Sequence, residues 1–125
     1  GDGTFLYMDR TGGLYRHSIA TGKLIWASGL HDPEPHVNTS GTAILGPDDV
    51  VYCTSNYKGE GYVHAYKLHD GAPLWQRNMK LEANQAVAIG RIAAYSGLSV
   101  IVGLGERSDL PLAISVPTWY PHFMI

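Results

Sequence analysis

The segment 31–36, His-Asp-Pro-Glu-Pro-His, gathers the side chains best suited to chemistry. Two imidazoles and two carboxylates within six residues could bind zinc or another divalent ion, with His31 and His36 as weak ligand candidates. Their spacing matches no strong metal-ligand pattern, and two prolines are typical of a stiff, solvated loop. We therefore predict a connection between two strands here, and no metal site.

The other reactive side chains do not form a catalytic set in the sequence. Asn38-Thr-Ser40 is an N-glycosylation sequon, which matters only if the chain enters a secretory pathway; Asn38 could instead cap a turn. Cys53 lies in an expected strand without an evident His or Asn partner, which predicts a buried, inert thiol. Gly103-Leu-Gly105 lacks the third glycine of a dinucleotide-binding loop. The pair Asp48-Asp49 is expected in a turn. The histidines near strand ends, His17, His64 and His69, are expected to be packing or surface residues.

Composition limits the class of protein. The 125 residues fit one domain, and 45% hydrophobic against 16% charged residues is enough apolar material for a core. The net charge of −2 and the lack of a basic block argue against a nucleic-acid partner. The longest apolar runs, such as Leu98–Leu104, are too short to span a membrane. The chain begins without Met and inside a repeat, so we expect it to be a segment of a longer protein.

An internal repeat positions these residues. Leu14–Trp26 aligns with Val63–Trp75, so that Gly22 matches Gly71 and Trp26 matches Trp75, both at an offset of 49. Upstream, Gly1–Tyr7 aligns with Gly46–Tyr52 at an offset of 45. The difference of four predicts an insertion in a glycine-rich turn, which comprises residues 9–13 in the first copy and a loop of 55–61 in the second. In a fainter third copy, Ala88-Ile89 resembles Ala43-Ile44, Val100–Val102 resembles Val50–Tyr52, Ala113 matches Ala65, and Phe123 takes the Trp position.

Each copy predicts short strands, A to D, separated by turns rich in glycine. The first copy, about 1–30, supplies only strands B to D, at 4–8, 14–19 and 24–28. The second, about 38–79, supplies all four at 42–45, 50–54, 62–68 and 73–77. The third, about 84–125, supplies strands at 85–91, 98–103 and 112–116, with a fourth near 120–124. Four-stranded repeats of this length are typical of β-propeller blades.

The repeat resembles the quinoprotein-type β-propellers, also called pyrroloquinoline-quinone (PQQ) repeat proteins. Their eleven-residue motif, Ala-x-Asp-x-x-Thr-Gly-x-x-x-Trp, is matched by Ala65, Gly71 and Trp75 in the second copy and by Gly22 and Trp26 in the first. The family's Asp is replaced in every copy. The resemblance implies an all-β fold of four-stranded antiparallel blades, here incomplete at just under three. A different propeller type or a β-solenoid stays open.

The resemblance implies that the motif tryptophans dock neighbouring blades and that the remaining blades or a partner protein cover the open faces. It favours an extracytoplasmic or lumenal location. The main functional expectation is a non-catalytic scaffold or binding surface without a cofactor. The alternative is a fragment of a PQQ-dependent alcohol or glucose dehydrogenase, which would use PQQ and calcium. No residue of this sequence can be assigned to those cofactor-binding roles.

Overall fold

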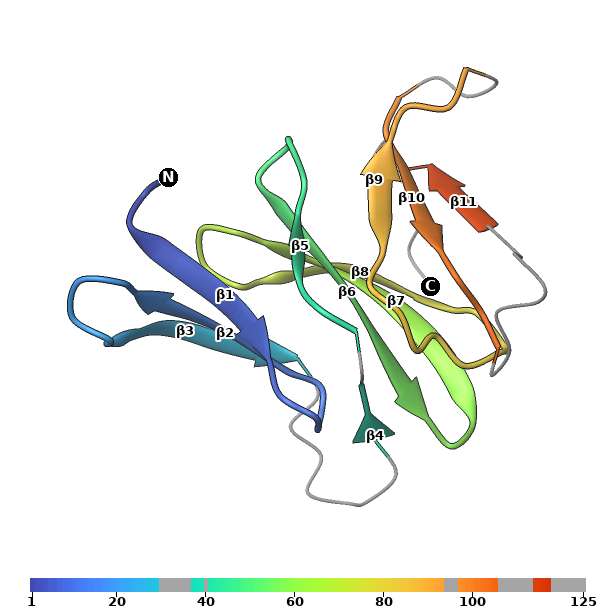
Figure 1. Ribbon diagram of the computed structural model, residues 1–125, viewed down its shortest axis with the longest axis horizontal. Helices are drawn as coiled ribbons and strands as arrows, with labels where there is room; N and C mark the ends of the chain where they lie inside the picture. Colours follow the sequence, from blue (N-terminus) through green and yellow to red (C-terminus); the bar gives the residue numbers. More distant parts are fainter. Residues whose placement is uncertain (30–36, 40, 94–96, 106–113, 118–125) are drawn as a thin grey trace.

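The computed structural model describes residues 1–29, 37–39, 41–93, 97–105 and 114–117. Within these ranges the chain contains eleven β-strands and no helix, arranged as three antiparallel sheets side by side (Figure 1). The first sheet contains β1 (Thr4–Met8), β2 (Gly13–Ser18) and β3 (Leu24–Gly29). The middle sheet contains β4 (Val37–Asn38), β5 (Ile44–Leu45), β6 (Val50–Tyr57), β7 (Glu60–Lys67) and β8 (Pro73–Asn78). The third contains β9 (Ala88–Gly90), β10 (Ser99–Val102) and β11 (Ile114–Pro117). The predicted all-β class is confirmed.

The hairpin between β6 and β7 is longer and tighter than the sequence predicts. The ladder extends to Tyr57 opposite Glu60, so only Lys58 and Gly59 form the turn. Their φ angles are 52° and 79°, the positive values that a two-residue type I′ turn requires. The extra residues of the second copy therefore lengthen both strands, and the predicted loop of 55–61 is wrong.

One edge of the middle sheet is formed by two short strands in succession. Both β4 and β5 pair with β6, Asn38 opposite Asn56 and Ile44 opposite Tyr52. The predicted strand at 42–45 therefore contributes only Ile44–Leu45, and a second contact with the same edge comes from residues before it. Between them Thr39 is buried, and its hydroxyl donates to the carbonyl of Thr54 at 2.7 Å.

The strand registers correct the repeat alignment by one residue. Leu6 lies opposite Arg16, which lies opposite Trp26; Tyr52 lies opposite Ala65, which lies opposite Trp75. Leu6, and not Tyr7, is therefore the equivalent of Tyr52, at an offset of 46. Because successive side chains of a strand point to opposite faces, this single residue decides which side chains meet the next sheet.

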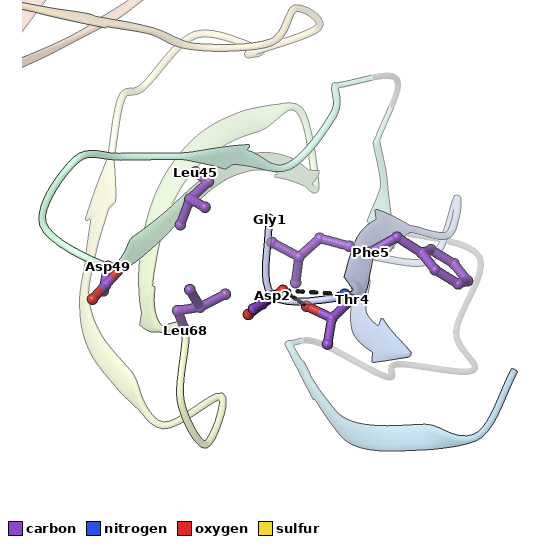
Figure 2. Close-up of a pocket in the computed structure, with 8 residues that line it drawn as sticks. Gly1, Asp2, Thr4, Phe5, Leu45, Asp49 and Leu68 are labelled. Atoms are coloured by element: carbon purple, nitrogen blue, oxygen red, sulfur yellow. Dashed lines mark hydrogen bonds between the residues drawn. The ribbon is translucent and has the colours of Figure 1, made fainter. Parts of the chain in front are cut away.

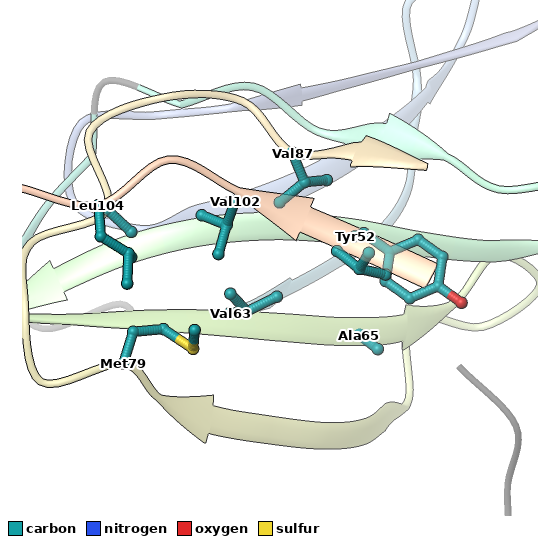
Figure 3. Close-up of a cluster of buried hydrophobic side chains, with 9 residues drawn as sticks. Tyr52, Val63, Ala65, Met79, Val87, Val102 and Leu104 are labelled. Atoms are coloured by element: carbon teal, nitrogen blue, oxygen red, sulfur yellow. The ribbon is translucent and has the colours of Figure 1, made fainter. Parts of the chain in front are cut away.

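Two clusters of buried side chains hold the sheets together. The cluster between the first and middle sheets includes the buried residues Leu14, Trp26, Val51, Cys53 and Tyr66. The cluster between the middle and third sheets is larger (Figure 3) and consists of Tyr52, Val63, Ala65, Met79, Ala83, Val87, Val100, Val102 and Leu104. Both faces of the middle sheet are thus covered, as a row of stacked repeats requires.

The third sheet keeps the predicted order of strands, with β10 between β9 and β11. Val100 and Val102 point toward the middle sheet, which precedes theirs. In the middle sheet, the β6 side chains that point toward the preceding sheet are Val51 and Cys53. Val100 is therefore equivalent to one of these two residues and not to Val50, so the alignment of Val100–Val102 with Val50–Tyr52 is wrong by an odd number of residues. The fourth strand expected near 120–124 and Phe123 lie outside the described residues. No helix in the part of the chain described here has the length and apolar character needed to cross a membrane.

Candidate functional site

The turn between β7 and β8 forms a socket for the indole of Trp26. The N–H of Gly71 donates to the carbonyl of Lys67, and Gly71 has a φ of 72°. This conformation favours glycine and leaves the carbonyl of Leu68 free to accept the indole N–H of Trp26 at 2.9 Å. A Cβ at Gly71 would lie 2.6 Å from Cε3 of Trp26, so the ring packs where a side chain would stand.

Arg16 makes a second link between the same two sheets. Its guanidinium donates to the carbonyl of Leu68 at 2.7 Å and to the carboxylate of Asp2 at 2.6 Å, and its Nε donates to the hydroxyl of Thr4. Arg16 occupies the position that Ala65 holds in the middle sheet. The sequence shows that Arg16 replaces the alanine of the family motif. It does not show the consequence, which is that the charged side chain binds the turn between β7 and β8.

The first sheet has the same turn between β2 and β3, but no ring of the described residues packs against it. The N–H of Gly22 donates to the carbonyl of Ser18, just as Gly71 donates to Lys67, and the φ of Gly22 is 68°. No atom lies within 4 Å of a Cβ built at Gly22. Ile19, the equivalent of Leu68, is 64% exposed. The turn between β2 and β3 therefore has the form of the Trp26 socket and is open among the described residues.

An aromatic patch formed by Phe5, Tyr7, Tyr15 and His17 covers the outer face of the first sheet. The rings stack closely, with centroids of Tyr7 and Tyr15 4.9 Å apart and those of Phe5 and His17 5.5 Å apart. Phe5 and Tyr7 remain 43% and 42% exposed. The corrected register makes these four residues the equivalents of the buried Val51, Cys53, His64 and Tyr66. In the middle sheet, the equivalent face is covered by the first sheet. In the first sheet, this face carries the exposed aromatic patch.

Asp9 fixes the hairpin beneath this patch. Its carboxylate accepts bonds from the N–H groups of Thr11 and Gly13 and from the hydroxyl of Tyr15 at 2.7 Å. Although desolvation alone would raise the pKa of Asp9, these hydrogen bonds outweigh it and lower the pKa to about 2. The carboxylate of Asp9 therefore stabilises the turn and positions the ring of Tyr15 in the patch.

A buried Ser55–His64 pair lies between the first and middle sheets, and no motif in the sequence signals it. The hydroxyl of Ser55 is 2.7 Å from Nε2 of His64, and both side chains are buried. His64 stacks near Tyr62 and Tyr66 and lies opposite Cys53 in the ladder. Burial lowers the pKa of His64 to about 4 and raises the pKa of the Cys53 thiol to about 12. The predicted burial of the Cys53 thiol is confirmed, and the Ser55–His64 pair is also buried.

We expect the protein to lose stability as the pH falls from about 6.5 to about 4. The pKa of His64 is about 4 in the folded chain, against about 6.5 unfolded, so the unfolded chain binds more protons in this range. The stabilisation is complete above pH 6.5, and its loss by pH 4 is on the order of 3 kcal/mol. Urea unfolding at several pH values measures it. His64→Gln, which cannot titrate, should flatten the slope between pH 6.5 and 5; an unchanged slope would contradict the assignment.

A cleft of about 330 Å³ opens between β1 and the middle sheet (Figure 2). It is lined by Gly1, Asp2, Thr4, Phe5, Leu6, Leu45, Asp49 and Leu68. Leu45 and Leu68 lie on one side, and the start of β1 lies on the other. The predicted turn at Asp48-Asp49 is confirmed. The carboxylate of Asp48 accepts a hydrogen bond from the hydroxyl of Tyr52 at 2.9 Å.

The carboxylates for which the structure gives partners make local contacts. Asp2 is paired with Arg16, and Asp9 and Asp48 accept hydrogen bonds within or beside their own turns. No group of three or more His, Cys, Asp or Glu side chains gathers within the described ranges. His31 and His36 lie outside these ranges. Asn38 is in β4, and the hydroxyl of its sequon partner Thr39 is buried in a hydrogen bond.

The remaining residues singled out in the sequence lie in the sheets and turns without forming a reactive group among the described residues. Trp75 shares the register of Trp26 but is only partly buried, with the ring of Tyr52 6.0 Å away. His17 lies in the aromatic patch, with Nδ1 2.9 Å from the carbonyl of Gly22. His69 is exposed on the turn that Trp26 contacts. Gly103-Leu-Gly105 follows β10 with Leu104 buried, and these three residues are not helical.

Residues 1–113 match the family model PQQ_2, described as outer membrane protein assembly factor BamB. The match includes all three sheets up to the start of β11. No curated protein matches the chain.

Proposed function

Because the chain belongs to the PQQ-repeat family of quinoprotein-like β-propellers, we propose that it is a non-catalytic scaffold segment that binds protein through its uncovered blade face. The observation that carries the proposal is the aromatic patch with its open turn at Gly22, which copies a face that is buried elsewhere in the same chain. Closed propellers have about four to eight blades, and this chain contributes three sheets. Its binding partners are therefore further blades or a protein surface of the same kind.

The chemistry of the aromatic patch supports protein binding. Exposed aromatic rings grouped on one face mark interaction surfaces in soluble proteins, and Tyr is enriched at the centre of such interfaces. On the middle sheet, the equivalent face is covered by Leu14 and Trp26 together with the partly buried Leu6 and Met8. A partner that presents leucine and an indole N–H would match the open turn in the same way.

We expect the chain to self-associate through the aromatic patch at micromolar concentration. Light scattering after size exclusion should give a mass above 13.6 kDa that falls on dilution. The variant Phe5→Thr with Tyr7→Thr keeps residues suited to a strand and should elute as a monomer. Its free energy of unfolding should stay within about 1 kcal/mol of the parent chain, as for surface changes. A monomeric parent chain, or a double variant that still associates, would count against the proposed surface.

We also expect no binding of PQQ or calcium by this chain. Asp2 is paired with Arg16 and Asp9 is bonded within its own turn, and no three His, Cys, Asp or Glu side chains gather among the residues that the structure describes. Incubation with PQQ and calcium followed by gel filtration tests this directly. Quinone absorbance that elutes with the protein and is lost on chelation would instead support the dehydrogenase alternative.

A further inference from the structure

The buried Ser55–His64 pair faces the contact between the first and middle sheets. Side chains of β7 alternate between two faces, and Val63 and Ala65 pack in the cluster shared with the third sheet, so His64 faces the first sheet. Ser55 faces the same way, because Cys53, two residues before it on β6, packs in the cluster shared with the first sheet. Both sides of this contact consist of residues that the structure describes.

The neighbours of His64 in the described chain are polar or aromatic but uncharged. Its Nε2 is 2.7 Å from the hydroxyl of Ser55, and its ring centroid lies 6.3 Å from that of Tyr62 and 6.0 Å from that of Tyr66. On β8 the residue opposite His64 is Gln76. His64 is 4% exposed, and this burial lowers its pKa to about 4. A proton on His64 would therefore leave a positive charge inside the contact between the sheets.

The titratable groups on this face of the middle sheet do not offset such a charge. They are Cys53, Glu60, Tyr62 and Tyr66. Burial raises the pKa of Cys53 to about 12 and also raises that of Tyr66, so both stay neutral in acid. Glu60 lies at the hairpin end of β7, where its carboxylate accepts a hydrogen bond from Asn78 and pairs with Lys80 at 3.8 Å.

The charged groups of the first sheet and of the turn before β6 have other partners or lie at the ends of the contact. They are Asp2, Asp9, Arg10, Arg16 and Asp49. Asp2 pairs with Arg16, which binds the carbonyl of Leu68 at the β7–β8 turn. Asp9 accepts hydrogen bonds within its own turn, and Arg10 is exposed. No ion pair of His64 occurs among the described residues.

The contact between the middle and third sheets contains no comparable group. Its buried cluster is the larger of the two, and the members described carry neither an imidazole nor a carboxylate. Asn56 also binds the connection from β8 to β9: its carboxamide donates to Asn84 at 2.6 Å and accepts from the N–H of Ala83 at 2.7 Å. Mild acid should therefore weaken the first contact and leave the second intact.

We propose that the Ser55–His64 pair is a pH-sensitive switch: when His64 takes up one proton, the first sheet separates from the middle sheet, while the middle and third sheets stay packed. The neutral imidazole shares one hydrogen bond with the Ser55 hydroxyl, whereas the imidazolium can only donate and its charge requires hydration. Separation hydrates His64 and exposes Cys53, which lies opposite it in the ladder. The switch acts on the inner face of the first sheet. The proposed binding surface is the aromatic patch on the outer face, so each proposal can fail alone.

The rate at which Cys53 reacts with dithiodipyridine tests the switch on the full chain. Cys53 is the single cysteine, and the reagent forms a mixed disulfide with an exposed thiol in mild acid, releasing thiopyridone. Relative to a free cysteine peptide, the rate should rise about twentyfold from pH 7 to pH 5, because the pKa of His64 is about 4 in the closed chain and about 6.5 in the open one. In His64→Gln the rise should be less than about twofold. The matched variant His69→Gln, on an exposed turn, should keep the full rise. No rise in the parent chain, or an equal rise in His64→Gln, would overturn the proposal.

Urea distinguishes the separation of one sheet from unfolding of the whole chain. At pH 5, Cys53 should react about tenfold or more faster than the globally unfolded fraction allows, and its rate should depend less steeply on urea, because less surface is exposed. A rate and a urea dependence equal to those of global unfolding would contradict the switch. If His64→Gln does not fold, an NMR titration of the His64 Cε1 proton in the parent chain takes its place. The closed chain should keep the shift of neutral imidazole at pH 5; a midpoint near pH 6.5 without a change in Cys53 reactivity would overturn the proposal.

Discussion

Trp26→Ala is expected to destabilise the chain by about 3–5 kcal/mol, the cost of truncating a buried aromatic side chain. Trp26 is 8% exposed and lies in the cluster between the first and middle sheets. Its removal opens a cavity there and deletes the bond from the indole N–H to the carbonyl of Leu68. Such a loss is a large part of the 5–15 kcal/mol that stabilises a typical domain. Urea unfolding followed by circular dichroism measures it.

Two matched variants separate the contributions. Trp26→Phe keeps a ring in the socket but lacks the N–H donor, so it should cost about 1–2 kcal/mol, near the value of one hydrogen bond. Trp75→Ala removes a partly buried ring at the same register and should cost less than Trp26→Ala. If Trp75→Ala proves the more damaging change, Trp26 is not the main link between the sheets.

Gly71→Ala should destabilise the chain by about 2–5 kcal/mol, because two penalties add. A non-glycine residue in the left-handed region costs about 1–2 kcal/mol, and the new methyl group would meet the ring of Trp26 at 2.6 Å. Overpacking of this kind costs about 1–3 kcal/mol. Chemical unfolding under the conditions used for Trp26→Ala gives the value.

Gly22→Ala is the internal control for this prediction. Its φ of 68° is nearly that of Gly71, but no atom of the described residues lies within 4 Å of the added methyl group. It should therefore cost only the conformational penalty of about 1–2 kcal/mol. The difference in lost free energy of unfolding between Gly71→Ala and Gly22→Ala measures the contact between Trp26 and the β7–β8 turn. Equal losses would show that the indole does not occupy the socket.

The sequence predicts the strands well because turn chemistry is local. Glycines at Gly22 and Gly71 and β-branched or aromatic runs define β1, β3 and β8 to within about two residues of their ends, as expected for boundary errors. The spacing from Gly to Trp is retained in both sheets, so the positions of Trp26 and Trp75 in the repeat could also be read directly.

Faces and contacts between sheets could not be predicted in this way. The tyrosines Tyr7 and Tyr52 align by residue type, but the strand pairing places Leu6, and not Tyr7, at the position equivalent to Tyr52. Arg16 and the Ser55–His64 pair depend on which face of a strand is buried, which a one-residue slip reverses. The contacts between sheets depend on that long-range register, so the sequence shows the motif residues but not which side chains they meet.

The central claim is that the first sheet docks on the middle sheet by seating Trp26 on the β7–β8 turn. A nuclear Overhauser spectrum of the labelled chain, recorded on the Phe5→Thr, Tyr7→Thr variant to limit association, tests this contact in solution. We predict cross-peaks from the Trp26 ring protons to the α protons of Gly71, and slow exchange of the indole N–H that Leu68 accepts. A folded chain in which these cross-peaks are absent and the indole N–H exchanges as fast as in a free peptide would contradict the account.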